Sequence, residues 1–277
     1  MTPSLSSHGE QKLTPQPLLD MNYAFARTAL LVAAVRLHLF THLSKKALTP
    51  AELAACADVV PEPAERLLQG LASLGLAERE GEAYRLTPMA DLFLVEGKPS
   101  YLGGDTLAMV DYIPAWFELD RTLSTSVPYR DLGDAATAEA FFAPRVIDLF
   151  PIVFPIATRT AAELPLVKQE DTALHVLDVG AGSAPWSAAF AHYYPSARIT
   201  ALGLPAVVEQ GRQQIANLGL SDRYTGIGAD METVVFPTLA TAICGTLTLN
   251  LEFTRATNRG RVDYDEDRTR LAWLKLG

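Results

Sequence analysis

Two closely spaced glycines occur where a strand is expected to turn into a helix, since residues 178–184 read DVGAGSA. Gly180 and Gly182 permit a tight turn and let a ligand approach the backbone with no Cβ in the way. A helix expected to begin near Pro185 would direct its free N–H groups toward the same place. The combination indicates a nucleotide or nucleoside ligand, and a purely structural turn is the alternative.

The features missing from this motif restrict the ligand further. A dinucleotide fingerprint requires a third glycine three residues after the second, and that position is Pro185. A triphosphate-binding loop requires a Gly-Lys-Ser/Thr sequence, which the chain lacks. S-adenosylmethionine carries no phosphate and needs only a close backbone approach, so it fits the motif.

Histidine and cysteine residues do not indicate a metal site. His38 and His42 are four residues apart without further ligands nearby, so we expect them at a surface or an interface. Cys56 and Cys244 lack ligand spacing and are expected to be buried. The absence of a disulfide framework favours the reducing cytoplasm.

The elements around the motif alternate between strand and helix. Strands are expected at residues 174–179, 198–202, 224–227 and, less clearly, 241–251, with helices at 185–194 and 206–218. A strand, helix and parallel strand in this order form a βαβ unit. The sequence therefore predicts an α/β, Rossmann-like domain.

The N-terminal part is expected to be mostly helical. Helices are expected at residues 23–43, from Pro50 through Cys56, and from Pro61 to Leu74, followed by strands at 76–79 and 83–86. Three helices and a hairpin follow the order of a winged helix. Further helices are expected at 103–122, 135–142 and 146–164, the last interrupted by Pro151 and Pro155, and aromatic residues in this region are expected mainly in the core.

These expectations divide the chain into four parts. They are a disordered tail at residues 1–17, a winged-helix-like domain at 18–98, a helical substrate region at 99–168 and a Rossmann-like domain at 169–277.

Charge and hydropathy disfavour two classes of partner. The chain has a formal net charge of −9 and a pI of about 5.1, so its average surface would repel nucleic acid and anionic membranes. The expected wing carries Glu78, Glu80 and Glu82, which disfavours DNA recognition. The longest apolar run, residues 29–35, is shorter than the roughly 20 residues that span a bilayer. We therefore expect no nucleic-acid or membrane partner.

Four sequence blocks in order resemble the S-adenosylmethionine-dependent small-molecule O-methyltransferases of plants and bacteria, which carry an N-terminal winged-helix dimerisation domain. The blocks are VLDVGAGS at 176–183, ITALGLPAVVE at 199–209, GLSDR at 219–223 and GADME at 228–232. The resemblance implies methyl transfer to a hydroxyl of an aromatic or polyketide-like metabolite by a cytoplasmic homodimer that pairs through its N-terminal half, without a metal ion.

The resemblance also implies roles for individual residues. Gly180 and Gly182 would border the methionine part of the cofactor, Leu204 would flank the adenosine, and Asp230 with Met231 would face the adenine. Alternatives for the last two are a loop cap for Asp230 and core packing for Met231. The complete set of candidate cofactor-binding residues is Asp178, Gly180, Ala181, Gly182, Gly203, Leu204, Asp230 and Met231.

Two departures from the family pattern are visible. Gly203 occupies the position where the family carries an acidic residue that holds the ribose. Beyond Pro237 the sequence no longer resembles the family, and no histidine follows His192 that could serve as the general base. The sequence therefore predicts a truncated or altered C-terminal part with no identifiable catalytic residue. The alternative function is a catalytically impaired relative that acts only as a dimerising partner subunit.

Overall fold

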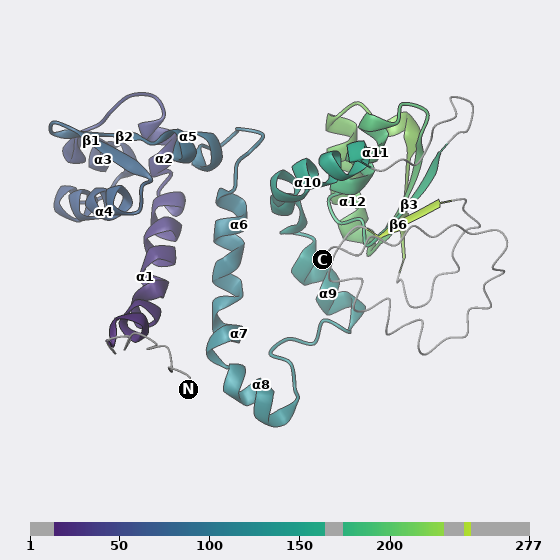
Figure 1. Ribbon diagram of the computed structural model, residues 1–277, viewed down its shortest axis with the longest axis horizontal. Coiled ribbons are helices and arrows are strands. Elements are labelled where there is room, and N and C mark those ends of the chain that lie inside the picture. Colours follow the sequence, from purple (N-terminus) through teal and green to yellow (C-terminus); the bar gives the residue numbers. More distant parts are fainter. Residues whose placement is uncertain (1–13, 164–173, 230–240, 245–277) are drawn as a thin grey trace, which may run out of the picture. The chain divides into compact units, whose positions relative to one another are not determined.

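The computed structural model describes residues 14–163, 174–229 and 241–244, with only the backbone for the last segment (Figure 1). The chain divides into two compact units, Met1–Glu96 and Gly97–Gly277. Each unit has its own hydrophobic clusters and is described by itself.

The N-terminal unit consists of five helices and one hairpin within its described residues. They are α1 (Gln16–Arg36), α2 (Leu39–Leu43), α3 (Pro50–Ala57), α4 (Pro61–Ser73), β1 (Ala77–Glu80), β2 (Ala83–Leu86) and α5 (Pro88–Leu94). The predicted helix at 23–43 divides in two because His38 adopts a left-handed conformation with φ of 54°. Helix α1 begins at Gln16, seven residues before the expected start at Tyr23 and within the expected tail 1–17. Tail residues 1–13 lie outside the description.

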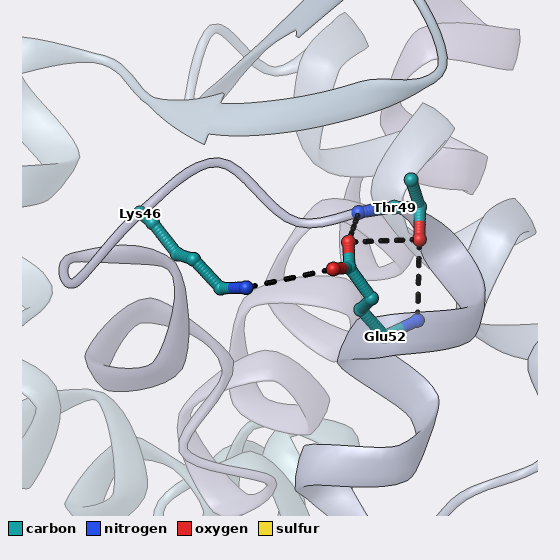
Figure 2. A network of polar contacts seen from close by, with 3 residues as sticks. All are labelled: Lys46, Thr49 and Glu52. Atoms are coloured by element: carbon teal, nitrogen blue, oxygen red, sulfur yellow. Dashed lines mark hydrogen bonds and ion pairs between the residues drawn. The ribbon is translucent and has the colours of Figure 1, made fainter.

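A reciprocal cap fixes the start of α3, as Figure 2 shows. The Thr49 hydroxyl accepts a hydrogen bond from the Glu52 N–H at 3.3 Å, and the Glu52 carboxylate accepts one from the Thr49 N–H at 2.8 Å. Such a capping box satisfies two N–H groups that the helix leaves unpaired, and loss of a cap costs about 1 kcal/mol. The exposed Lys46 ammonium, 3.5 Å from Glu52, adds little.

Helix α5 was missed from the sequence, although the same signal precedes it. Thr87 and Pro88 repeat the Thr-Pro pair that opens α3, and the Thr87 hydroxyl accepts a hydrogen bond from the Ala90 N–H at 3.3 Å. The core of the unit contains Leu39, Phe40, Leu53, Leu68 and Leu71, all nearly inaccessible. Cys56 is exposed, so the prediction that it is buried was wrong: α3 turns Leu53 and Ala54 to the core.

The second unit begins with a run of short helices. They are α6 (Gly103–Ala108), η1 (Met109–Asp111), α7 (Ile113–Phe117), α8 (Leu119–Thr125), α9 (Ala135–Phe142), η2 (Val146–Leu149) and α10 (Phe150–Glu163). The expected single helix at 103–122 is broken near Pro114, which lacks an N–H and opens α7 instead. The expected split at 146–164 occurs next to Pro151, whereas α10 continues through Pro155.

The aromatic residues of these helices divide between core and surface. Phe141 and Phe150 are buried, as expected. Trp116 and Phe117 are 72% and 76% exposed, so the prediction of a core position was wrong for both. The short α7 has no buried residue, which leaves these rings without a covering element in the described part of the chain.

The α/β region contains a parallel sheet whose described strands follow the order β5-β4-β3-β6. Its elements are β3 (His175–Val179), α11 (Pro185–Tyr193), β4 (Arg198–Gly203), α12 (Pro205–Asn217), η3 (Ser221–Arg223), β5 (Tyr224–Gly228) and β6 (Thr241–Cys244). The chain passes from β3 outward to β5 and returns to the other side of β3. A ligand crevice is expected at this reversal, beyond the carboxyl end of β3.

The sheet alternates its side chains between two faces. Val176 and Ile199 pack with Phe190 of α11 and Ala161 of α10, whereas Leu177, Val179 and Leu202 form a cluster on the opposite face. Figure 1 shows α10, α11 and α12 gathered around the sheet. The architecture confirms the predicted α/β, Rossmann-like domain, which follows a helical domain in the chain. The completeness of the sheet depends on residues outside the description.

One described helix, α1, is long and apolar enough to cross a membrane by length and composition alone. It has 21 residues, and its most apolar window is 17% buried within the chain. The bent pair of segments Ala135–Phe142 and Val146–Glu163 passes the same criterion only if counted as one span. Core helices of soluble proteins and signal sequences also meet this criterion, so the expectation of no membrane partner stays a prediction.

Candidate functional site

The glycine motif forms a loop of left-handed residues at the carboxyl end of β3. Gly180, Gly182 and Ala184 have φ values of 68°, 59° and 61°. The N–H groups of Gly180 and Ala181 donate to the Leu202 carbonyl of β4 at 2.8 and 3.2 Å, which ties the loop to the neighbouring strand. Gly180 and Gly182 stay partly exposed, so their backbone is open to a ligand.

Close packing surrounds the loop on two sides. A Cβ added to Gly182 would lie 3.0 Å from Val146 Cγ2 of η2, and one added to Gly211 would lie 2.9 Å from the Gly182 carbonyl oxygen. Helix α12 therefore approaches the loop more closely than any side chain at position 211 would allow. The two glycines let η2 and α12 hold the loop without a covalent or ionic contact.

The Asp178 carboxylate connects β3 to the start of α11, the two elements that flank the loop. This carboxylate is fully buried, and its Oδ2 accepts hydrogen bonds from the Ser187 N–H at 3.0 Å and the Ser187 hydroxyl at 2.6 Å. Ser187 is in the first turn of α11, whose N-cap residue Ala184 contributes no side-chain bond. A carboxylate from β3 thus caps the N-terminus of α11. Its negative charge also interacts favourably with the partial positive charge at that end of the helix.

Burial dominates the electrostatics of this carboxylate. Desolvation raises the pKa of Asp178 to about 6, against the opposing effect of its hydrogen bonds from Ser187. Its Oδ1 has no hydrogen-bond partner among the described atoms, and neither has the buried Tyr224 hydroxyl. Burial raises the pKa of Tyr224, and the nearby Asp178 charge raises it further.

The second predicted segment adjoins the glycine loop. Gly203 ends β4, pairs with Gly228, and its carbonyl accepts a hydrogen bond from the Ala229 N–H at 2.8 Å. A Cβ at Gly203 would lie 4.0 Å from the Ala181 N and 3.3 Å from Val208 Cγ2. The structure thus brings the 180–182 loop and the end of β4 together, with the half-buried Leu204 next in the chain.

The remaining site predictions have different outcomes. Asp230 and Met231 lie outside the described residues, so their roles stay predictions. Ala181 is buried, and the buried Asp178 carboxylate faces Ser187 rather than the open side of the loop. Sequence reasoning missed Ser187 and Tyr224. A serine in the first turn of α11 was a signal for the former, while only the fold brings Tyr224 near Asp178.

The chain is similar to known O-methyltransferases in sequence and in fold. Residues 19–96 match the O-methyltransferase dimerisation domain. The chain is 27% identical over 217 residues to 3-hydroxy-5-methyl-1-naphthoate 3-O-methyltransferase of Streptomyces sahachiroi, which covers 78% of this chain and 63% of that protein. It is 29% identical over 255 residues to the tetracenomycin polyketide synthesis 8-O-methyl transferase TcmO of Streptomyces glaucescens, which covers 88% and 71%.

The chain is a relative of the small-molecule O-methyltransferases. The solved structure of PigF with SAH shares its fold, with a TM-score of 0.75 and 20% identity over 90% of this chain and 78% of the other. The resemblance of the sequence blocks to this family is thereby confirmed. This relative of the O-methyltransferases spans less than two thirds of the naphthoate enzyme's length, so its own activity is a matter for proposal.

Proposed function

We propose that this protein binds S-adenosylmethionine at the glycine loop and transfers its methyl group to a hydroxyl of an aromatic, polyketide-like metabolite. The observation that carries the proposal is the loop of Gly180 and Gly182 at the switch point of the sheet, with its backbone accessible. The solved relative that contains SAH supports the choice of cofactor, and the naphthoate and tetracenomycin enzymes support the class of acceptor.

The cofactor would lie across the carboxyl ends of β3 and β4. Gly180 and Gly182 would border its methionine part, as the family resemblance implies, and the backbone of both is partly exposed. Leu204, at the N-terminal end of α12, would flank the adenosine. Asp178 would act as a positioning residue, since its buried carboxylate caps α11 beneath the loop.

The reaction would be a direct displacement at the sulfonium methyl group. The acceptor oxygen would form a bond to the methyl carbon as the carbon–sulfur bond breaks, leaving S-adenosylhomocysteine, and the hydroxyl proton would pass to a base. The described residues do not identify that base, so positioning of the two reactants is the contribution that the structure supports. Methyl transfer by positioning alone needs no metal ion.

The assembly and location belong to the same proposal. The matched dimerisation domain supports a homodimer that pairs through the N-terminal unit. A net charge of −9 and the small-molecule substrates of the named relatives support a cytoplasmic enzyme of secondary metabolism without a nucleic-acid partner.

A methyl-transfer assay tests the proposed function. The purified chain is incubated with S-adenosylmethionine carrying a labelled methyl group and a panel of hydroxylated aromatic compounds that includes 3-hydroxy-2-naphthoate. We expect label in an ether product, and much less with Gly182→Ala than with Gly219→Ala. Position 219 has φ of 70° and no atom within 4 Å of an added Cβ, so it controls for backbone strain alone. Cofactor binding without any labelled product would instead support the non-catalytic partner subunit.

A further inference from the structure

The end of β4 and the start of α12 carry no acidic residue of their own. Gly203, the last residue of β4, occupies the position of the family's ribose-binding acid. The next residue, Leu204, is the N-cap of α12 and makes no side-chain hydrogen bond, and the first turn of the helix contains no acid. This part of the proposed cofactor site therefore lacks a carboxylate from its own strand and helix.

A glutamate from another helix reaches the same place. Glu139 of α9 lies 67 positions before Ala206, and its Oε1 accepts a hydrogen bond from the Ala206 N–H in the first turn of α12. A carboxylate there satisfies one of the N–H groups that a helix leaves unpaired, and its negative charge is favourable at the positive end of the helix. The structure thus supplies an acid to the start of α12 from outside the α12 sequence.

Packing joins the start of α12 to the ends of two strands. Gly228 of β5 pairs with Gly203, and a Cβ added to Gly228 would lie 2.9 Å from the Pro205 Cα. The next residue, Ala206, is the one that bonds Glu139. The Glu139 carboxylate therefore adjoins the carboxyl edge of the sheet, where folds of this kind bind the ribose of a nucleoside ligand.

The second oxygen of Glu139 is available to a ligand. No described residue donates a hydrogen bond to its Oε2, and the side chain is only half-buried. The carboxylates of β3 and α12 have other partners. Asp178 is fully buried and accepts hydrogen bonds from Ser187, while Glu209 forms an ion pair with Arg212. Glu139 is thus better placed than either of them to accept a hydrogen bond from a bound molecule.

We propose that Glu139 replaces the missing acid at position 203, with its Oε2 accepting a hydrogen bond from a ribose hydroxyl of S-adenosylmethionine while its Oε1 caps α12. The inference rests on the proposed function and adds a cofactor-binding residue that lies outside the four sequence blocks of the family. A hydroxyl that donates to a carboxylate forms a strong hydrogen bond. Oε2 holds one of the two ribose hydroxyls, so a second carboxylate at position 203 would still add affinity.

Calorimetric titration of the full chain with S-adenosylhomocysteine and with its 2′-deoxy and 3′-deoxy analogues tests this assignment. Glu139→Gln retains an acceptor for the Ala206 N–H and removes the charge. We expect it to weaken binding of S-adenosylhomocysteine by about tenfold, the difference between a charged and a neutral acceptor. The analogue that lacks the contacted hydroxyl should bind the parent and Glu139→Gln equally, because the interaction is absent from both complexes.

Glu209→Gln is the matched control. It removes the same charge from an exposed position of α12, so the affinities for all three compounds should stay unchanged. Because the ligands are compared on one folded variant, a general loss of stability cannot produce a difference between them.

Two results with Glu139→Gln would overturn the inference. An equal loss of affinity for all three compounds would make Glu139 a helix cap only, and no loss for any of them would remove it from the cofactor site. Failure of the parent chain to bind S-adenosylhomocysteine would instead refute the proposed function, and this inference with it.

Discussion

At the scale of single residues, Asp178 shows how one buried carboxylate links a strand to the next helix. It bonds two groups of Ser187 nine residues along the chain and leaves its other oxygen without a partner in the described structure. The carboxylate is therefore better solvated in the unfolded chain than in the folded protein. The consequence is a dependence of stability on pH.

The pKa of Asp178 predicts the sign of that dependence. The folded pKa of about 6 exceeds the ordinary pKa of 3.8 for an aspartate, so the folded protein binds more protons than the unfolded chain between these pH values. The contribution of this group to stability is full below about pH 4 and is lost as the pH rises through 6, a difference of about 3 kcal/mol. Asp178→Asn, which retains an acceptor for Ser187, should gain stability relative to the parent as the pH rises from 4 to 7 in urea unfolding.

Asp134 provides a control of opposite sign. It caps α9 through Thr137, and the Thr137 hydroxyl and N–H lower its pKa. Asp134→Asn should therefore lose stability relative to the parent as the pH rises. A pH-independent difference between Asp178→Asn and the parent would contradict the burial argument.

Substitution of Gly203 by an acidic residue is predicted to increase the affinity for the cofactor. The family carries an acid at this position, and a Cβ here requires Val208 Cγ2 to move by a few tenths of an ångström from 3.3 Å. Gly203→Asp should place a carboxylate near the ribose and tighten S-adenosylhomocysteine binding by about tenfold or more. Gly203→Asn supplies the same bulk without charge, so calorimetry should show a much smaller gain in affinity for S-adenosylhomocysteine. Equal affinity of the two variants would place the ribose elsewhere.

At the scale of elements, local signals predicted much of the fold. The helix that begins at Pro50, the hairpin of strands 76–79 and 83–86 and the strand–helix alternation after residue 174 were all predicted from the sequence and confirmed. The break of the expected 103–122 helix was missed. The helical spacing of apolar residues continues from one short helix to the next even where the chain changes direction. The contact of Val146 with Gly182 was also beyond prediction, since a pairing of residues 36 positions apart depends on the tertiary fold.

The packing of α12 on the loop gives a prediction for Gly211. Alanine ordinarily stabilises a helix by about 1 kcal/mol relative to glycine. Here the added Cβ would lie 2.9 Å from the Gly182 carbonyl, a backbone atom that cannot rotate away. We expect Gly211→Ala to weaken S-adenosylhomocysteine binding by at least tenfold and to lower the melting temperature.

Gly70 of α4 is the matched control for this substitution. Its added Cβ would meet only the flexible end of Leu30, at 3.1 Å. Gly70→Ala should leave cofactor affinity unchanged. Cofactor binding by Gly211→Ala equal to that of the parent would show that α12 does not position the loop.

At the scale of the whole molecule, the exposed apolar side chains of α1 bear on assembly. Leu18, Met21, Tyr23 and Phe25 are between 61% and 72% exposed in the single chain. Apolar side chains gathered on one helix of a matched dimerisation domain favour burial against a second copy. The same composition lets α1 meet the length and hydropathy expected of a membrane span.

Sedimentation distinguishes a dimer that buries α1 from a chain that inserts α1 into a membrane. We expect the purified chain to be a dimer without detergent, and Phe25→Glu to shift it toward monomer by burying an unpaired charge at the interface. Val60→Glu, at an equally exposed position outside α1, should remain dimeric. A chain that stays in solution only with detergent would contradict dimerisation through α1.

The central claim is that the left-handed glycine loop is a working cofactor site, and calorimetric titration with S-adenosylmethionine and S-adenosylhomocysteine tests it most directly. We predict micromolar binding of both that Gly182→Ala weakens by at least tenfold and Gly219→Ala leaves unchanged, because only position 182 lies at the loop. A folded protein that binds neither compound at millimolar concentration, or equal binding by the two variants, would contradict the account.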